Sequence, residues 1–519
     1  MNQPDPAGGR ARRRGAIRGR APAKTAIQQM PWMLPQFSDP PVAPLDSEGV
    51  ARIDANAMRI LKEIGIDFLH EDAKRVLHGA GAEVDPDSDR VRMDEQFVRA
   101  HLATAPSSFT VTPRNPEHAL VWGAGHYCFG AVASPPNVRD LDHGRREGTR
   151  EDCRDLLRLT QFFNCIHFNS GYPVEPVDVH PSVRHLDALY DALTLCDKVM
   201  HAYSLGTARI EDGMEMVRIA AGLTHREFDA APRMFTNINS SSPLKHDWPM
   251  LDGAMRCAKR GQPVIVTPFT LCGAMAPVTL AGAVSLQTAE ALAAIVLLQI
   301  VNPGAPVVYG SFTSNVDMKS GAPAFGTPEY ARATQMSGQM ARFYGLPMRA
   351  SNACVANYPD GQAVWESSAS LQACNSAHCN IVYHAAGWLE SGLCTSFEKF
   401  VMDCELLQQM NAYQSAVGVS EDDLAFDAIR AVGPHDHFLG AAHTQARYKT
   451  AFYSPFLSDW RNFESWELAG AEHAERRANT LYKQILREFE PPPMDEAIRE
   501  ELAAFVAKRR EEGGAPTDF

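Results

Sequence analysis

The fold is decided by four short apolar segments in the middle of the chain: KVMHAYSL (198–205), RMFTNINS (233–240), PVIVTPFT (263–270) and PVVYGSFT (306–313). Each is rich in residues that favour β-strands, and each is followed by a stretch with helical periodicity. Extending the pattern in both directions gives eight predicted strands, which begin at Cys128, Phe163, Lys198, Arg233, Pro263, Pro306, Met348 and Ile381.

The number and spacing of these strands favour a closed barrel. Their starts are separated by 35, 35, 35, 30, 43, 42 and 33 residues, and one strand–helix unit of a barrel needs roughly 30 residues or more. Eight parallel strands close a barrel, whereas an open doubly wound sheet usually has fewer. No Gly-rich phosphate loop follows any predicted strand, so a dinucleotide-binding fold gains no support. We therefore predict a (β/α)8 TIM barrel over residues 121–410, with an N-terminal α/β extension (46–120) and a C-terminal helical extension (411–519).

The N-terminal region differs in charge from the rest of the chain. Residues 1–45 are rich in Pro, Gly and Arg and are predicted to be a disordered basic tail and linker, although the tail could also dock on an acidic partner. Residues 1–24 contain seven Arg or Lys and one Asp, a local charge of +6, so the remaining residues carry −13 − 6 = −19. A body this acidic repels phosphate backbones, and we expect no nucleic-acid partner.

Two features predict a cytoplasmic protein. The eleven cysteines lack framework spacing, and no apolar run follows the basic N-terminus as it would in a secretory signal.

Residues 278–301 are almost continuously apolar, but Gln287, Glu290 and Gln299 interrupt them. This segment is therefore predicted to be a core helix and not a membrane span.

The predicted strand ends carry the candidate site, because the chemistry of a (β/α)8 barrel lies at the carboxyl ends of its strands. These ends are rich in aromatic and amide side chains and poor in charge. We predict a substrate-binding site formed by Phe129, Tyr203, Asn239, Phe269, Tyr309, Phe312, Asn315, Asn352, His384, Trp388 and Glu390.

Such a lining suits a quaternary ammonium ion, which has no proton to donate and is held by ring faces, at about 0.5–2 kcal/mol per ring. Glu390 could add Coulomb attraction, while Asn239 and His384 could hold the carboxylate of a betaine. Each residue also has an ordinary structural interpretation. His384 could be a core histidine, Glu390 a carboxylate at a helix N-terminus and Asn239 a loop cap.

Metal-dependent hydrolysis is a weaker hypothesis. Barrels of that kind carry paired histidines on the first strand, and the sequence from Cys128 to Ala133 has none. The groups Cys374/His378/Cys379 and His435/His437/His443 are poor metal-binding signals, so we expect no bound metal. A metal-dependent TIM-barrel hydrolase and a catalytically silent betaine-binding or sensor protein stay open as alternatives.

Several separate segments resemble one family: ILKEIGIDF (60–68), HGAGAEVDPDSDRVRMDEQFV (78–98), GTPEYARATQMSGQMARFYGLPMR (326–349), HAAGWLESGLCTSFEKFVMDCELL (384–407), GPHDHFLGAAHTQARY (433–448) and FLSDWRNFESWELAG (456–470). Together they are similar to the trimethylamine methyltransferase family, in its branch without pyrrolysine. The resemblance implies a TIM barrel, a methylated amine as donor and a small corrinoid-binding protein as methyl acceptor. Family members that use trimethylamine carry pyrrolysine, whereas residues 351–357 here read SNACVAN, which implies a betaine as donor.

The resemblance also implies how the reaction runs. The nucleophile is the cobalt of the partner's corrinoid, so we expect neither a nucleophilic residue nor a tightly bound cofactor on this chain. The amine leaves in its neutral form and needs no general acid. The resemblance carries over His384 and Asn239 as substrate-binding residues. It leaves open which betaine is used, and a homo-oligomer is possible.

Overall fold

Eight parallel strands form the centre of the computed structural model, which describes residues 27–517. The prediction of a disordered tail over residues 1–26 lies outside the described residues. Neighbouring strands pair in parallel, and a parallel bridge between His201 and Phe235 joins the two edge strands. The predicted TIM barrel is confirmed. In spatial order its strands are β10 (Val199–Met200), β9 (Phe168–Asn169), β6 (Cys128–Ala131), β19 (Ile381–Ala386), β18 (Met348–Ser351), β15 (Val307–Gly310), β13 (Val264–Val266) and β11 (Thr236–Ile238).

Six strands begin within one residue of the predicted position, and β11 begins three residues later than predicted. The largest error concerns the second strand, which was predicted to begin at Phe163 but begins at Phe168. Phe163 instead ends helix α4 (Arg150–Phe162), and its carbonyl accepts a hydrogen bond from the Lys198 ammonium at 2.8 Å. Its aromatic side chain favours a strand, but its carbonyl is already bound and cannot enter a strand ladder.

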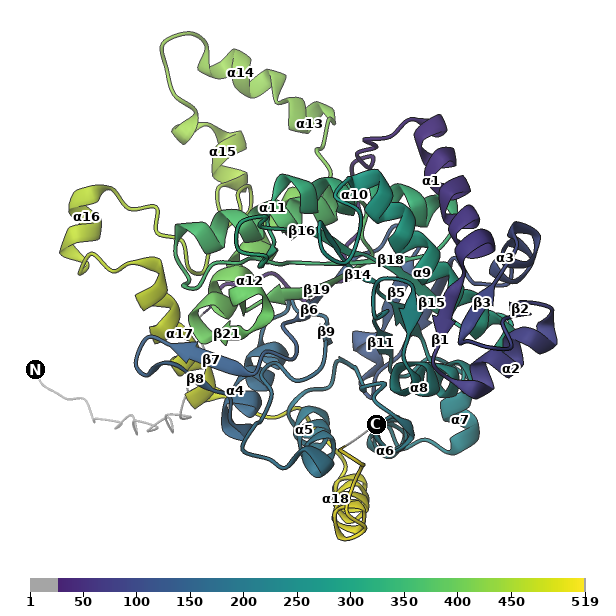
Figure 1. The fold of residues 1–519 in the computed structure, drawn as a ribbon. Helices are drawn as coiled ribbons and strands as arrows, with labels where there is room; N and C mark the ends of the chain where they lie inside the picture. The colour runs from purple at the N-terminus through teal and green to yellow at the C-terminus, as the bar shows by residue number, and fades with distance from the viewer. Residues whose placement is uncertain (1–26, 518–519) are drawn as a thin grey trace, which may run out of the picture.

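Helices surround the barrel (Figure 1). The helices that follow the strands are α4, α5 (Pro181–Leu195), α6 (Thr207–Ala220), α8 (Trp248–Lys259), α9 (Leu280–Val301), α10 (Pro328–Phe343), α11 (Gly361–Ser376) and α12 (Phe397–Tyr413). Helix α9 is long and apolar enough to cross a membrane, but 89% of its most apolar window is buried. It packs between α8, α10, α1 (Ser47–Arg59) and α3 (Glu95–Leu102), as predicted for a core helix.

The amino end of the barrel is plugged by the N-terminal part of the chain. The hairpin β4 (Ser108–Val111) and β5 (Leu120–Gly123) brings Trp122 against the ring of Phe235 in the barrel interior, at 5.1 Å between centroids. Residues 27–45, predicted as linker, pack here as well: the Met33 carbonyl lies 3.0 Å from His167 Nε2. Since this end is filled, the site lies at the opposite, carboxyl end.

The remaining N-terminal elements cover one side of the barrel. They are a π-helical turn (Ile60–Ile64), α2 (Glu71–Ala80) and the small sheet of β1 (Ile66–Phe68), β2 (Glu83–Val84), β3 (Arg90–Arg92) and β12 (Lys245–His246). Helices α1 and α3 dock this unit onto α9. The N-terminal region therefore combines helices and strands, as the sequence predicts.

Extra strands line the carboxyl end. After barrel strand β6, the chain forms a hairpin of β7 (Asn137–Asp140) and β8 (Gly144–Glu147), which pairs with β21 (Cys394–Ser396). A second group, β14 (Phe269–Cys272), β16 (Phe312–Val316) and β17 (Pro323–Ala324), follows barrel strands β13 and β15. These strands fix loops that would otherwise lack backbone partners.

The C-terminal part is helical and extends in two directions. Helices α17 (Ala474–Glu488) and α18 (Glu496–Glu511) pack back on the barrel layer, α17 on α12 and α18 on α5 and α6. Helices α13 (Glu421–Leu424), α14 (Phe426–Val432), α15 (Ala442–Arg447) and α16 (Phe463–Leu468) project away from the body instead (Figure 1).

Candidate active site

A cleft of about 440 Å³ opens at the carboxyl ends of the barrel strands. Its walls carry five aromatic rings, those of Tyr203, Phe269, Phe312, Tyr383 and Trp388. Within residues 27–517, no Asp or Glu side chain lines it. The cleft is therefore built to receive apolar or cationic groups against ring faces.

Six of the eleven predicted site residues meet in this cleft. They come from strand ends far apart in the sequence and are Tyr203, Asn239, Phe269, Phe312, His384 and Trp388. The residues at the carboxyl ends of the strands therefore include most of the predicted aromatic side chains and both residues expected to bind a carboxylate, Asn239 and His384.

Three predicted residues on or directly after barrel strands lie outside the cleft. The Tyr309 hydroxyl points into the helical layer, where Gln287 of α9 donates to it at 3.0 Å. Phe129 is buried in the core between barrel and helices, and Asn352 is buried while donating to a backbone carbonyl. Side chains alternate between the two faces of a strand, so residue type and strand end alone do not decide which face a residue occupies.

The remaining two, Asn315 of β16 and Glu390 of a short 3-10 turn, lie outside the cleft lining and have other partners. Arg145 Nε donates to both carboxylate oxygens of Glu390, at 2.9 and 3.0 Å. The Asn315 amide accepts from the Thr327 hydroxyl at 2.9 Å. Glu390 is therefore already neutralised by a neighbouring cation, and the expected carboxylate for the ammonium ion is not in the cleft.

The cleft instead contains a cation that sequence reasoning missed. Arg349 of β18 lines it with only 4% of its surface exposed. Its guanidinium carbon lies 4.4 Å from the ring centroid of Tyr383 and 5.5 Å from that of Phe312. Within residues 27–517 it forms no ion pair, and its Nε has no hydrogen-bond partner. Burial lowers the pKa of Arg349, yet a guanidinium stays protonated.

The signal for Arg349 was present in the sequence. It is the second residue of the strand predicted to begin at Met348, and barrel strands are buried on both faces. A charged residue inside such a strand needs a reason, because burying an unpaired charge is expensive. The expectation that the site is poor in charge overlooked this position.

His384 stands beside Arg349 as a neutral donor. Its Nδ1 accepts from the backbone N–H of Ala133 at 3.2 Å, so the ring proton belongs on Nε2. Burial, and secondarily the Arg349 charge, lowers the pKa of His384 well below its ordinary value. Its backbone has φ of 54°, a strained conformation typical of functional sites. The ring centroid lies 4.3 Å from that of Trp388.

Asn239 is fixed by a chain of hydrogen bonds. The Asn237 amide donates to Asn239 Oδ1 at 3.1 Å, and the Thr267 hydroxyl donates to Asn237 Oδ1 at 2.8 Å. Asn239 lines the wall of the cleft, and its amide nitrogen donates no hydrogen bond to another side chain or to the backbone within residues 27–517. It is a further neutral donor.

A buried carboxylate on α9 holds the loop that follows Asn239. Glu290 accepts from the hydroxyls of Ser240 and Ser242, at 2.5 and 2.6 Å, and from the backbone N–H of Leu244 at 2.7 Å. Burial raises the pKa of Glu290. Ser240 and Ser242 therefore anchor the loop to Glu290, which explains why the apolar helix α9 carries an acid.

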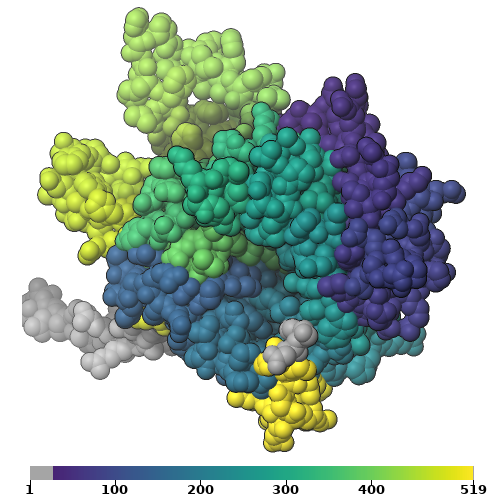
Figure 2. Space-filling view, in the orientation of Figure 1, coloured from purple at the N-terminus to yellow at the C-terminus, as the bar shows by residue number. Residues whose placement is uncertain are grey.

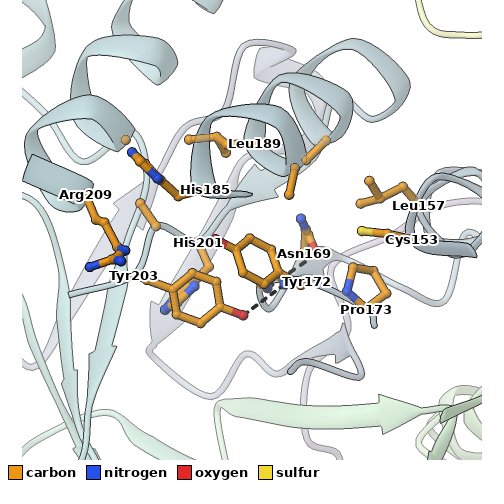
Figure 3. A pocket seen from close by; sticks show the side chains of 15 residues that line it. Cys153, Leu157, Asn169, Tyr172, Pro173, His185, Leu189, His201, Tyr203 and Arg209 are labelled. Atoms are coloured by element: carbon orange, nitrogen blue, oxygen red, sulfur yellow. Dashed lines mark hydrogen bonds between the residues drawn. The ribbon is translucent and has the colours of Figure 1, made fainter. Parts of the chain in front are cut away.

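A second cavity lies behind the cleft wall, between α4, α5 and α6 (Figure 3). His201 and Tyr203 line both cavities. The Tyr203 hydroxyl is held by the backbone N–H of Tyr172 at 3.0 Å and by the Ser134 hydroxyl at 2.6 Å. The second cavity measures about 20 Å³, room for about one water molecule. It is too small for an amine substrate, so the open cleft is the candidate site.

The described part of the chain offers no ligand set for a metal. Across residues 27–517, no three His, Cys, Asp or Glu side chains are grouped closely enough to hold an ion. The alternative of a metal-dependent hydrolase therefore gains no support from these residues.

Comparisons with known proteins identify the family. The family model described as trimethylamine methyltransferase (MTTB) matches residues 8–514. Glycine betaine methyltransferase of Desulfitobacterium hafniense (strain Y51) is 38% identical over 91% of this chain and 98% of its own length. Trimethylamine methyltransferase MttB of Desulfitobacterium hafniense (strain DSM 10664 / DCB-2) is 27% identical over 91% of this chain and 95% of its own length.

One solved structure is similar over most of its length. The monomethylamine methyltransferase of Methanosarcina barkeri covers 86% of this chain and 98% of its own, with 9% identity and a TM-score of 0.46. Assignment of the barrel here rests on strand order, and assignment of the family rests on the sequence match over residues 8–514. The chain belongs to the trimethylamine methyltransferase family.

Proposed function

We propose that this protein transfers a methyl group from a betaine to the cobalt of a corrinoid carried by a small partner protein. The observation that carries the proposal is the unpaired, buried Arg349 among the aromatic rings of the cleft. A betaine is a zwitterion, with a quaternary ammonium and a carboxylate. The cleft offers rings for the first group and a cation for the second.

The carboxylate is expected to bind Arg349, with His384 and Asn239 as neutral donors nearby. Arginine presents paired N–H groups that match a carboxylate, and such bonds are strong where water is excluded. The carboxylate would also complete the charge balance that Arg349 lacks in the described structure. His384 keeps a proton on Nε2 and can donate without becoming charged.

The same arginine disfavours cationic substrates without a carboxylate. Trimethylammonium and choline would bring a second positive charge close to Arg349, and no acidic side chain among the described residues of the cleft would offset it. This agrees with the 38% identity to a glycine betaine methyltransferase and the 27% identity to a trimethylamine methyltransferase. Glycine betaine is therefore our first candidate for the donor.

The chemistry asks little of the protein beyond positioning. The C–N bond breaks, its electron pair stays on nitrogen, and the amine leaves neutral, so no general acid is needed. The corrinoid supplies the nucleophile when the partner is bound. Positive charge leaves the nitrogen in the transition state, and the nearby Arg349 charge therefore destabilises the ammonium more in the ground state than in the transition state. Rings such as those of Trp388 and Phe312 hold the methyl groups in line.

Exposed apolar side chains around the cleft support docking of a partner protein. Val278, Met318, Trp365 and Leu393 all lie in segments that follow barrel strands at the carboxyl end, and each is 56–71% exposed. Apolar side chains grouped around a site are typical of protein interfaces. The partner would approach from this face, since the other end of the barrel is plugged.

We place this reaction in the cytoplasm. All eleven cysteines are unpaired and buried, as expected in a reducing compartment. No disulfide links the described parts of the fold.

The test is methyl transfer by the purified protein to reduced cobalamin, with glycine betaine, carnitine, choline and trimethylamine as donors. Formation of methylcobalamin from a carboxylated donor, and from neither choline nor trimethylamine, is the expected result. Transfer from trimethylamine alone would contradict the proposal. Binding of a betaine by calorimetry, without transfer to cobalamin or to a cognate corrinoid protein, would identify a binding protein instead.

A further inference from the structure

Residues 415–470, here called the arm, leave the end of α12 and carry helices α13 to α16. Figures 1 and 2 show that these helices stand clear of the barrel and its helical layer, whereas α17 returns to it. No residue of α13, α14, α15 or α16 is buried in the structure as described. The arm therefore differs from the rest of the chain, where the helices bury an apolar face.

The arm exposes an unusual amount of apolar surface. Twelve large apolar side chains within it are exposed, and six of them show 71–90% of their surface: Val417, Val419, Leu439, Phe452, Trp460 and Leu468. At about 100 Å² each, the twelve exposed side chains together present on the order of 1,200 Å² of apolar surface. A standard interface buries roughly 800 Å² per partner.

The arm also fails to fill its own interior. Helices α13, α14 and α15 enclose a hollow of about 990 Å³, lined by Phe426, Val432 and Ala441 among others. These helices have only four to seven residues each. Helices this short are unstable in water unless they pack against something. A partner surface that stabilises these short helices must therefore be bound to the arm whenever the arm is folded.

We propose that the arm packs against a second copy of this chain. Two identical copies bring the same apolar surface to each other, as a two-fold interface requires, and obligate homodimers have apolar interfaces of this size. A corrinoid protein that must come and go would leave the arm bare between cycles. The basic segment 1–26 has only Met1 and Ile17 as large apolar residues. These are too few to cover the twelve exposed apolar side chains of the arm. The proposal does not depend on the identity of the methyl donor.

Light scattering with size-exclusion chromatography tests this on the full chain. The expected mass is at least twice the chain mass of 57.0 kDa. Leu439→Ser, Phe452→Ser and Leu468→Ser combined should lower this mass at least twofold. These side chains are 73–90% exposed, so their loss removes little packing within one chain. Trp365→Ser, at an aromatic outside the arm that is 64% exposed, should leave the mass unchanged. A wild-type mass of 57.0 kDa at micromolar concentration would overturn the proposal.

Hydrogen exchange provides a readout that does not rely on the variants. Amides of residues 421–447 should exchange slowly in the wild type and faster on dilution, because dissociation exposes them. Fast exchange at every concentration would contradict a partner of any kind. If deletion of residues 2–26 alone both halves the mass and speeds exchange in the arm, the basic segment covers the arm and the second-copy proposal fails.

Discussion

Two buried cations at opposite ends of the barrel show how structure and function use the same kind of charge. Lys198, at the amino end before β10, is 2% exposed, and its ammonium donates to the carbonyls of Thr160, Phe163 and Ile166 at 2.6–2.8 Å. Arg349, in the cleft at the carboxyl end, is 4% exposed and has no ion pair within residues 27–517. Both side chains are removed from water, but only the Lys198 ammonium has hydrogen-bond acceptors around it.

The difference separates a structural residue from a binding residue. All three N–H groups of Lys198 are used, so it has nothing left to offer a ligand and serves to fix the end of α4. The guanidinium of Arg349 faces rings and the open cleft, so its hydrogen bonds are available to a substrate. A buried charge without a partner costs stability, and the substrate carboxylate offsets that cost on binding. The following predictions test this contrast.

The largest effect is expected from Arg349→Met. Loss of the carboxylate partner should lower kcat/KM for a betaine by about 30-fold or more, since truncating one member of a desolvated charge pair costs about 2–5 kcal/mol. The free energy of unfolding should stay the same or rise, because an unpaired charge is removed. Steady-state kinetics measures the change in kcat/KM, and urea unfolding measures the change in the free energy of unfolding. A large loss of stability with normal kinetics in the folded fraction would make Arg349 a structural residue.

Lys198→Met should show the reverse pattern. It leaves three buried carbonyls without their donor, and we expect the free energy of unfolding to fall by about 3 kcal/mol. In the folded protein, kcat/KM should be unchanged, because Lys198 lies at the plugged end. Urea unfolding and kinetics on the same preparation check both. A drop in kcat/KM comparable to that of Arg349→Met would remove the contrast between the two cations.

Stability should fall with acid because two barrel histidines are held neutral. Burial lowers the pKa of His167 and of His201 from 6.5 to about 3. Between these values the unfolded chain binds protons that the folded chain does not, so stability is lost as pH falls from 6.5 toward 3. Each histidine contributes about 1.4 kcal/mol per pH unit, or about 2 kcal/mol by pH 5. A pH-independent urea midpoint between pH 5 and 6.5 would contradict this.

The smallest effect is expected at the aromatic wall. Trp388→Leu keeps an apolar side chain but removes a ring face, and kcat/KM should fall about 3- to 30-fold, corresponding to the range for one cation–π contact. Tyr309→Phe is the matched control, because the Tyr309 hydroxyl faces α9 and not the cleft. Equal losses in both variants would indicate a general packing defect.

The barrel was predictable because its signal is repeated. Eight segments with the same alternation fix the strand count, and an error at one of them, such as Phe163, does not change the result. Helix α9 was predictable for a related reason: Gln287, Glu290 and Gln299 interrupt its apolar run, and each now has a polar partner inside the protein.

The site was only partly predictable because it depends on side-chain direction and partners. Tyr309 and Phe312 belong to the same strand region and have similar side chains, yet one faces α9 and the other the cleft. Glu390 was expected to attract the ammonium ion, but Arg145 lies 245 residues away in the sequence and binds it. The position of Arg349 inside a predicted buried strand could have marked it as a candidate, but the lack of an ion-pair partner within residues 27–517 is visible only in the fold.

The central claim is that Arg349 binds the carboxylate of the donor, and calorimetry of two ligands on two proteins tests it most directly. Glycine betaine and choline share the trimethylammonium group, but only the first has a carboxylate. Wild type should bind glycine betaine at least tenfold more tightly than choline, and Arg349→Met should abolish that preference. If Arg349→Met binds both ligands as the wild type does, Arg349 does not bind the carboxylate and the proposed substrate recognition is wrong.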